Sequence, residues 1–197
     1  MDLQLKGKTA IVTGGSAGIG LAISKALAAE GVTVTVPGRS KEKLDKALAG
    51  ISNVKAIVAD PGTADGAAAL IQQVPDTDIL INNLGIYEPK PFAEITDADW
   101  LKIFEVNVLS GVRLSRHYFP LMLQRDWGRI IFISSESGVM TPPEMIHYGV
   151  TKSSQLAISR GLAELTKGTA VTVNTILPGP TRSEGIVDFL NCDFLSG

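Results

Sequence analysis

Short apolar runs rich in β-branched residues alternate with helical segments along most of the chain. The six runs expected to form strands cover residues 8–12, 32–36, 54–59, 78–81, 128–134 and 170–176. Helical spacing or capping signals predict helices between them, over about 21–28, 41–49, 63–74, 97–124 and 146–167. Strands that alternate with helices are joined by right-handed crossovers in a parallel sheet. The pattern therefore predicts an α/β fold with a doubly wound parallel sheet.

The size and charge of the chain exclude several classes of protein. Its 197 residues, 45% of them hydrophobic, suit one sizeable core, so we expect a single domain over residues 1–197. The net charge of -2 comes from 18 basic and 20 acidic residues that are well interspersed. No basic stripe marks a nucleic-acid or membrane surface, so neither partner is expected.

Metal binding and export are not indicated either. His117, His147 and Cys192 are isolated, so we expect no metal site and no internal disulfide. The first residues show no basic region followed by an apolar run and a cleavage pattern, which argues against a signal peptide. No apolar stretch approaches the ~20 residues of a membrane span. The sequence predicts a cytoplasmic protein.

A glycine-rich turn separates the first strand from the first helix. It reads TGGSAGIG over residues 13–20, with glycines at 14, 18 and 20 rather than in the G-x-G-x-x-G spacing of many dinucleotide enzymes. Glycines let a backbone approach a phosphate closely, and the helix amides attract its charge. We expect a pyrophosphate here, held by Gly14, Ser16, Gly18, Ile19 and Gly20. A tight turn without a ligand remains the alternative.

The second and third strands end in residues that suit an adenosine. Pro37-Gly38-Arg39-Ser40 offers no carboxylate for a ribose 2′-hydroxyl, whereas Arg39 suits a 2′-phosphate. This favours NADP(H) over NAD(H), with Arg39 and Ser40 as cofactor-binding residues, unless Arg39 merely faces solvent. Asp60 is placed to accept a bond from the adenine amino group or to cap the next turn.

The segment between the fifth strand and the last helix holds a hydroxyl, a phenol and an ammonium. Ser135 lies thirteen residues before Tyr148, and Tyr148 lies four before Lys152, one helical turn away. A cation beside the phenol is expected to lower the pKa of Tyr148 from ~10 toward the range of a general acid or base. By itself Tyr-x-x-x-Lys is a chance spacing. Strand alternation turns Ser134 away from Ser135.

The predicted helix over 97–124 contains two unusual positions. Trp100, Ile103, Phe104 and Val108 are expected to point inward. Asn107 lies in mid-helix, where a polar side chain is costly unless it is hydrogen-bonded. Pro120 predicts a kink or a boundary near the helix end.

With these residues in place, the chain resembles the short-chain dehydrogenase/reductase family over nearly all its length. TGGSAGIG at 13–20 is similar to the family's TGxxxGxG, and NNLG at 82–85 to its NNAG. Ser135 with Tyr148 and Lys152 resembles the family's Ser and Tyr-x-x-x-Lys set, and Asn107 its helical asparagine. VNTILPG at 173–179 resembles the strand and turn near the nicotinamide. The resemblance implies a Rossmann-like NAD(P)-binding fold.

The resemblance also implies roles for these residues. Tyr148 would protonate a carbonyl oxygen, Lys152 would lower the pKa of Tyr148 and bind the nicotinamide ribose, and Ser135 would bond the substrate oxygen. Asn107 would hold a water that links Lys152 to solvent. Further cofactor contacts are implied for Asn83, Gly85, Pro178, Gly179 and Thr181. The family often dimerises through the two long helices, which implies a homodimer or homotetramer.

Two departures from the family pattern stand out. Leu84 replaces a small alanine beside the cofactor, where we expect local accommodation. The family commonly adds a substrate lid, another helix and a seventh strand, whereas residues 182–190 suit only the start of a lid helix and residues 191–197 show no strand pattern. The sixth strand is then expected to form a sheet edge.

Two functions follow from these features. The first is an NADP(H)-dependent oxidoreductase, a carbonyl reductase that also runs as an alcohol dehydrogenase, with Tyr148 as proton donor and acceptor. The alternative is a truncated dinucleotide-binding protein, a sensor or interaction module with little turnover. The loops over 86–95 and 136–146 mix apolar, acidic and aromatic residues, which permits many small carbonyl or alcohol substrates.

Overall fold

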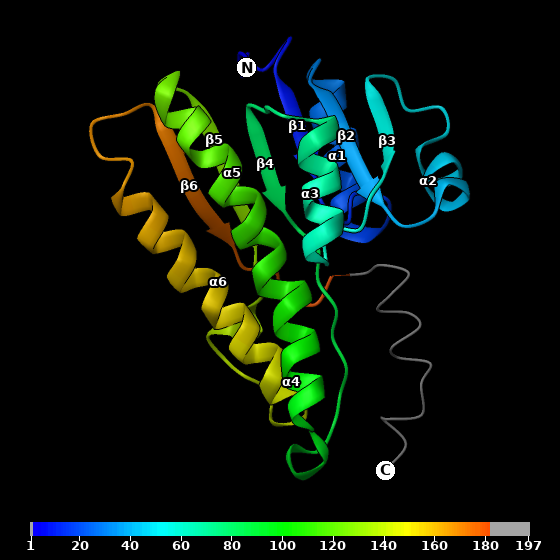
Figure 1. Cartoon of the computed structure of the whole chain (residues 1–197), viewed down its shortest axis with the longest axis vertical. Coiled ribbons are helices and arrows are strands. Elements are labelled where there is room, and N and C mark those ends of the chain that lie inside the picture. The colour runs from blue at the N-terminus through cyan, green and yellow to red at the C-terminus, as the bar shows by residue number, and fades with distance from the viewer. Residues whose placement is uncertain (1, 182–197) are drawn as a thin grey trace.

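Six parallel strands form one sheet at the centre of the molecule (Figure 1). The computed structural model describes residues 2–181. The strands are β1 (Thr9–Val12), β2 (Thr33–Gly38), β3 (Val54–Val58), β4 (Ile79–Asn82), β5 (Gly128–Ile133) and β6 (Val171–Ile176). Their order is β3-β2-β1-β4-β5-β6. The prediction of a doubly wound parallel sheet is confirmed, and each strand lies within two residues of its predicted bounds.

Helices cover both faces of the sheet because the buried strands are apolar on both sides. Apolar side chains of α1 (Gly18–Ala29) and α2 (Lys41–Leu48) pack on one face. Those of α3 (Ala64–Gln73), α5 (Ser110–Gln124) and α6 (Ile146–Glu164) pack on the other. In Figure 1, α3 and α5 lie in front of the sheet, and α6 runs beside α5. The core is therefore two apolar layers separated by the strands.

The segment predicted as one helix over 97–124 is a continuous run with a π-helical turn in its middle. It consists of α4 (Asp97–Phe104), the π-turn η2 (Glu105–Leu109) and α5. Thr96 and Asp99 form a capping box at its start. Of the two alternatives predicted at Pro120, a helix boundary is not found at that residue, because α5 continues past it to Gln124.

The face of this run that points inward differs in part from the prediction. Ile103 and Val108 are buried as expected, Trp100 is only half-buried, and Phe104 is 37% exposed. Ile103 and Asn107 lie one turn apart and both are buried, so the stripe that faces the interior runs through them. Phe104, about 100° further round the helix, is turned to the outer surface.

The strand order creates a crevice at the carboxyl edge of the sheet. β1 pairs with β2 on one side and with β4 on the other, so the chain reverses direction across the sheet at this point. Ligands of open α/β sheets bind outside the carboxyl ends of the strands at such a switch. The segments that follow β1, β2, β4 and β5 all carry predicted site residues, and they meet there.

Other elements complete the described chain. Short 3-10 turns cover Phe92–Glu94, Glu136–Gly138 and Pro143–Met145. In the described residues β6 pairs only with β5, in agreement with the predicted edge. Within residues 2–181 there is no helix with the length and apolarity of a membrane span, and no cluster of metal-ligand side chains. The predicted lid helix, the tail and Cys192 lie outside the described residues.

Candidate active site

The glycine turn owes its shape to close backbone packing. Gly14 and Gly18 have φ angles of 63° and 48°, in the left-handed region that favours glycine. A Cβ on Gly20 would lie 2.3 Å from the carbonyl oxygen of Gly14, so a side chain does not fit there. α1 begins at Gly18, and no side chain caps its first amides. The turn therefore presents free N–H groups at the start of a helix, where an anion is stabilised.

Asn83 and Thr13 fasten this turn to the end of β4. The Asn83 side chain donates to the carbonyl oxygens of Thr13 at 2.9 Å and of Gly14 at 3.3 Å. Thr13 Oγ1 in turn accepts from the backbone N–H groups of Asn83 and Leu84, at 2.9 and 3.0 Å. The Asn83 amide is thus engaged with the glycine turn itself and holds the backbone of that turn in place. Thr13 had no predicted role.

A cleft of about 340 Å³ lies between the glycine turn and the ends of β2 and β3. Its lining includes the predicted residues Gly14, Ser16, Arg39, Ser40 and Asp60. It also includes Lys43, which the sequence analysis missed. The available signal was its place as the third residue of a helix that starts directly after Arg39 and Ser40. Two cations and a helix N-terminus therefore face one cleft, which suits a phosphate-bearing ligand.

Ser40 and Asp60 both have local structural partners. Ser40 caps α2 by accepting from the Lys43 N–H at 3.3 Å. One carboxylate oxygen of Asp60 accepts from the Gly62 N–H at 3.0 Å, so the capping interpretation is confirmed for that oxygen. Leu84 lines the same cleft, and a Cβ on Gly62 would lie 3.5 Å from its side chain. Gly62 therefore lies next to the Leu84 side chain, at an ordinary packing distance.

Ser135 and Tyr148 meet at the carboxyl end of β5. Their side chains share a hydrogen bond, which lowers the pKa of the phenol in part. The Ser135 hydroxyl also accepts from the Ser137 N–H at 3.1 Å. Ser134 points the other way and donates to the carbonyl oxygen of Lys152 at 2.8 Å. The predicted alternation of the two serines is confirmed, and both serines are hydrogen-bonded to residues of α6.

Lys152 is almost completely buried beneath Tyr148, with 4% of its surface exposed. Its Nζ donates to the carbonyl oxygen of Ile133 at 3.0 Å and to Gln155 Oε1 at 3.4 Å. The ammonium lies 5.5 Å from the centre of the Tyr148 ring. Burial lowers the pKa of Lys152 to about 8, so at neutral pH it is still mainly a cation.

The predicted lowering of the pKa of Tyr148 is not found in this structure. Burial raises the pKa of its phenol, the hydrogen bond from Ser135 lowers it, and Tyr87 raises it further. Tyr87 lies edge-on to Tyr148, with ring centres 6.2 Å apart. Helical spacing brings the Lys152 cation to 5.5 Å from the centre of the Tyr148 ring, but burial is the largest cause of the shift in the pKa of the phenol. The phenol is therefore protonated at neutral pH.

Asn107 has the bonded environment that its mid-helix position requires. Its side chain accepts from the Ile86 N–H at 2.7 Å and donates to the Ile86 carbonyl oxygen at 2.8 Å and to Thr151 Oγ1 at 3.0 Å. It is 1% exposed. Asn107 thus joins the loop after β4 to α6 beside Tyr148 and Lys152. Thr151, a further residue absent from the predicted set, completes this link.

The remaining predicted residues lie around this cluster. A Cβ on Gly85 would lie 3.5 Å from both Asn107 Oδ1 and Lys152 Nζ. The Pro178 carbonyl oxygen accepts from the Glu136 N–H at 3.1 Å, and the Thr181 hydroxyl donates to the Gly179 carbonyl oxygen at 2.9 Å. The turn after β6 is thereby joined to the residue that follows Ser135.

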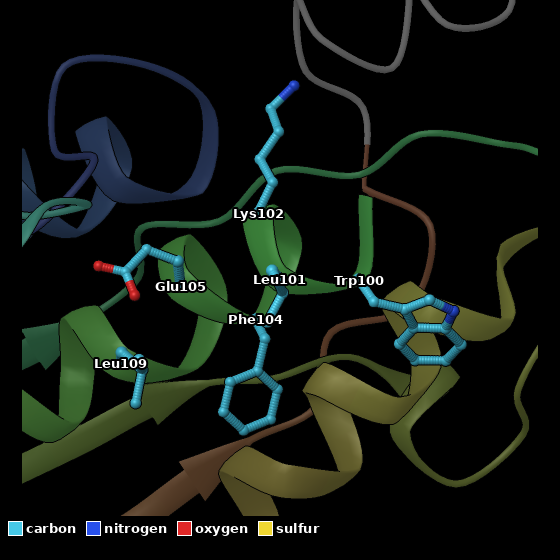
Figure 2. A pocket seen from close by; sticks show the side chains of 6 residues that line it. All are labelled: Trp100, Leu101, Lys102, Phe104, Glu105 and Leu109. Atoms are coloured by element: carbon cyan, nitrogen blue, oxygen red, sulfur yellow. The ribbon is translucent and has the colours of Figure 1, made fainter. Parts of the chain in front are cut away.

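A separate hollow of about 550 Å³ lies on the outer face of α4, away from the crevice (Figure 2). Leu101 and Phe104 line it, and they are 72% and 37% exposed. Figure 2 shows Leu101, Phe104 and Leu109 on one side of the run and the Lys102 ammonium pointing away from them. Exposed apolar residues that gather on one surface form a candidate interaction site.

The fold and the cluster at its carboxyl edge can be compared with known proteins. The sequence matches the family described as short chain dehydrogenase over residues 8–189. The chain belongs to this family. Short chain dehydrogenases are oxidoreductases that use NAD(P), act on small molecules and are commonly oligomeric.

The similarity to individual short chain dehydrogenases extends over nearly the whole chain. It is 49% identical to the uncharacterized oxidoreductase YvrD of Bacillus subtilis (strain 168), and the match covers 96% of this chain and 74% of YvrD. A solved short chain dehydrogenase/reductase family protein is 34% identical with a TM-score of 0.92, over 99% of this chain and 83% of its own.

A third relative has a bound cofactor. The L-sorbose reductase of Gluconobacter frateurii, solved with NADPH and L-sorbose, is 31% identical with a TM-score of 0.91. The match covers 96% of this chain and 75% of the reductase.

Proposed function

We propose that this short chain dehydrogenase transfers hydride between NADP(H) and a small carbonyl or alcohol substrate, with Tyr148 as proton donor and acceptor. The observation that carries the proposal is the convergence of Ser135, Tyr148 and Lys152 at the carboxyl edge of β5. A hydroxyl bonded to the phenol and a buried cation 5.5 Å from its ring form the set that proton transfer to a carbonyl oxygen needs.

The protein side of the reaction follows from the protonation states. The raised pKa of Tyr148 keeps its proton in place until a carbonyl oxygen begins to gain charge. Tyr148 then gives that oxygen its proton, Ser135 donates a hydrogen bond to the same oxygen, and the Lys152 cation stabilises the phenolate that is left. When bound, NADP(H) supplies the hydride that the carbonyl carbon receives. In the reverse direction the phenolate takes the proton of the alcohol.

The preference for NADP(H) is supported by the cleft beside the glycine turn. Arg39 and Lys43 both line it, and it has no carboxylate at the position after β2 that suits a ribose diol. The side chain of Asp60 has a second oxygen beyond the one bonded to Gly62, and we propose it for the adenine amino group. The NADPH bound to L-sorbose reductase is in keeping with this assignment.

A homo-oligomer is proposed from the outer surface of the long helices. Leu101 and Phe104 of α4 and Val150 of α6 are exposed apolar residues, and Val150 is 41% exposed. Packing two copies through α4, α5 and α6 would cover them, as the resemblance implied for a homodimer or homotetramer. Mass measurement in solution tests this assignment.

The deciding experiment measures NADPH oxidation with a panel of small ketones, aldehydes and ketoses. The wild type is expected to reduce at least one of them. The Tyr148→Phe variant, which keeps the ring and loses the proton, is expected to lose at least a thousandfold in turnover. NADPH affinity, measured by fluorescence, is expected to stay within about threefold because the phosphate site is untouched.

Tyr118→Phe is a matched control, since Tyr118 is a buried tyrosine whose hydroxyl donates to the Val74 carbonyl oxygen far from the crevice. It is expected to lose stability but to keep its turnover. Full activity in Tyr148→Phe contradicts the proposal. Tight NADPH binding without turnover across the panel favours the non-catalytic alternative instead.

A further inference from the structure

Gln155 is a buried polar residue for which neither the sequence motifs nor the proposed chemistry has a use. It lies on α6, one turn after Lys152, and is 2% exposed. Its Nε2 donates to the backbone carbonyl oxygen of Asn107 at 2.6 Å. Its Oε1 accepts from Lys152 Nζ at 3.4 Å. One side-chain amide therefore bridges the π-turn and the buried ammonium.

The bridge connects two elements that are far apart in the chain. Asn107 belongs to η2, and Gln155 and Lys152 belong to α6, which runs beside the α4–α5 segment in Figure 1. A π-turn interrupts the regular hydrogen-bond ladder of a helix and is common at functional sites. Here it presents the Asn107 carbonyl to α6, where the Gln155 amide takes it. The hydrogen bond to the Asn107 carbonyl oxygen fixes the Gln155 amide, and this amide in turn fixes the Lys152 ammonium.

The ammonium of Lys152 has three N–H groups with fixed mutual directions. The Ile133 carbonyl oxygen takes one and Gln155 Oε1 takes a second. The centre of the Tyr148 ring lies 5.5 Å from Nζ, and Gly85 is also close, since a Cβ on it would lie 3.5 Å from Nζ. We propose that Gln155 is a positioning residue, which holds Lys152 so that its third N–H is directed into the crevice beside Tyr148. The inference rests on the proposed function, in which Lys152 serves Tyr148.

The bridge joins Asn107 and Lys152, the same two residues that the resemblance implies are linked by a water. In this chain a direct amide bridge connects the Asn107 carbonyl to Lys152. An amide donates on one side and accepts on the other, but its N–H is not acidic enough to pass a proton along. Gln155 therefore orients the ammonium and does not act as a proton carrier.

The surroundings of Lys152 make its titration a sensitive reporter of this bond. Tyr148 is the titratable side chain that faces it, from the same helix. Its contacts from β5 and η2 are neutral: the Ile133 carbonyl oxygen, and Asn107 through Gln155. Burial is the cause of its lowered pKa. The Gln155 oxygen is thus a neutral acceptor that favours the charged form, and changing it should change the titration midpoint.

The test is a titration of the free protein labelled with carbon-13 at lysine Cε, followed by NMR, with the Lys152 signal assigned from Lys152→Met. Gln155→Leu removes the acceptor and should lower the Lys152 midpoint by about one unit. Gln155→Glu replaces it with an anion and should raise the midpoint by at least about one unit. Ser154→Ala, the neighbouring residue whose hydroxyl bonds its own helix at Val150, should leave it unchanged.

Shifts in opposite directions support the inference, because general damage to the helix would move both variants the same way. Equal midpoints in all variants, or shifts of the same sign, overturn it. If Gln155→Leu does not fold, the upward shift in Gln155→Glu decides alone. With any substrate that the wild type reduces, Gln155→Leu should also lower kcat roughly tenfold with KM within about threefold.

The two proposals fail in different ways. If the Lys152 midpoint shifts in opposite directions in Gln155→Leu and Gln155→Glu but the wild type reduces no substrate, the proposed function is contradicted and the Gln155–Lys152 bond is supported. If the wild type reduces a substrate but Gln155→Leu leaves the Lys152 midpoint and kcat unchanged, only the positioning role of Gln155 is contradicted.

Discussion

The two ends of the crevice are built in opposite ways. At the cleft beside the glycine turn, Arg39 and Lys43 lie on either side of the start of α2, and Arg39 is exposed. At the other end, Asn107, Lys152 and Gln155 are buried, and each is hydrogen-bonded to an element other than its own. One end depends on charges placed by local sequence, and the other on a network assembled by the fold.

The difference indicates where substitutions should cost stability and where they should cost only affinity. An exposed cation meets its ligand without prior partners, so its removal leaves the folded protein intact. A buried network member leaves unpaired groups behind when it is removed. The effects of substitutions at the two ends should therefore separate into affinity and stability.

The largest effect on folding is expected from Asn107→Ala. It leaves the N–H and carbonyl oxygen of Ile86 and the Thr151 hydroxyl without their partner, which should cost about 3 kcal/mol of unfolding free energy. Urea denaturation measures the loss. Asn174→Ala, at an exposed position of β6, is the control and should change stability by less than about 0.5 kcal/mol. Similar small losses in both variants would remove the contrast between the two ends.

The second effect is a pH dependence that belongs to Lys152. The pKa of this residue is about 8 in the folded protein and near 10.5 unfolded, so between those values the unfolded state binds more protons. Stability conferred by the wild-type residue therefore rises with pH in this window. Relative to Lys152→Met, the wild type should gain about 2.5 kcal/mol between pH 7 and pH 10.

The measured quantity is the difference in unfolding free energy between the wild type and Lys152→Met at each pH, from urea denaturation. The acceptors that Lys152→Met leaves unpaired add an offset that does not vary with pH, and the titrations of other groups are largely common to both proteins. A difference that stays flat from pH 7 to pH 10 would contradict the lowered pKa.

At the other end, Arg39→Ala is expected to affect affinity alone. Loss of a charge-assisted bond to a 2′-phosphate corresponds to about 2 kcal/mol, or roughly thirtyfold weaker NADPH binding, with NADH binding unchanged. Lys41→Ala is the control, because Lys41 pairs with Asp45 at 2.6 Å and does not line the cleft. An unchanged preference between the two cofactors in Arg39→Ala would refute the NADP assignment.

The smallest effect is expected from Ser40→Ala, which removes the cap of α2. The cap bond of 3.3 Å is long, so the loss of stability should be about 0.5 to 1 kcal/mol. Thermal unfolding measures it. A loss as large as that of Asn107→Ala would show that the cleft end also carries part of the structural network.

Much of this structure could be predicted because its signals are local. Apolar runs with β-branched residues marked every strand of the described sheet, and the glycine spacing marked the turn with its left-handed Gly14 and Gly18. The choice of Ser135 over Ser134 followed from its distance to Tyr148 in the family pattern, and strand alternation predicted that the two serines point opposite ways. The alternation of strands and helices then left few topologies open.

Other features escaped the sequence because they depend on long-range contacts. Thr151 and Gln155 join the candidate site only through their contacts with the π-turn and with Lys152. The pKa of Tyr148 was expected to fall because helical spacing places a cation nearby, whereas tertiary burial raises it. Phe104 was expected inside, but the stripe through Ile103 and Asn107 turns it outward.

The sequence by itself determined the sheet, the glycine turn and the positions of Ser135, Tyr148 and Lys152, because periodicity and spacing act within a few residues. Only the tertiary structure decided the electrostatics of that set. The pKa of a buried group depends on desolvation and on partners from other elements, here the Ile133 carbonyl and the Gln155 amide beside Lys152. These surroundings exist only once α6 has packed against β5 and the π-turn.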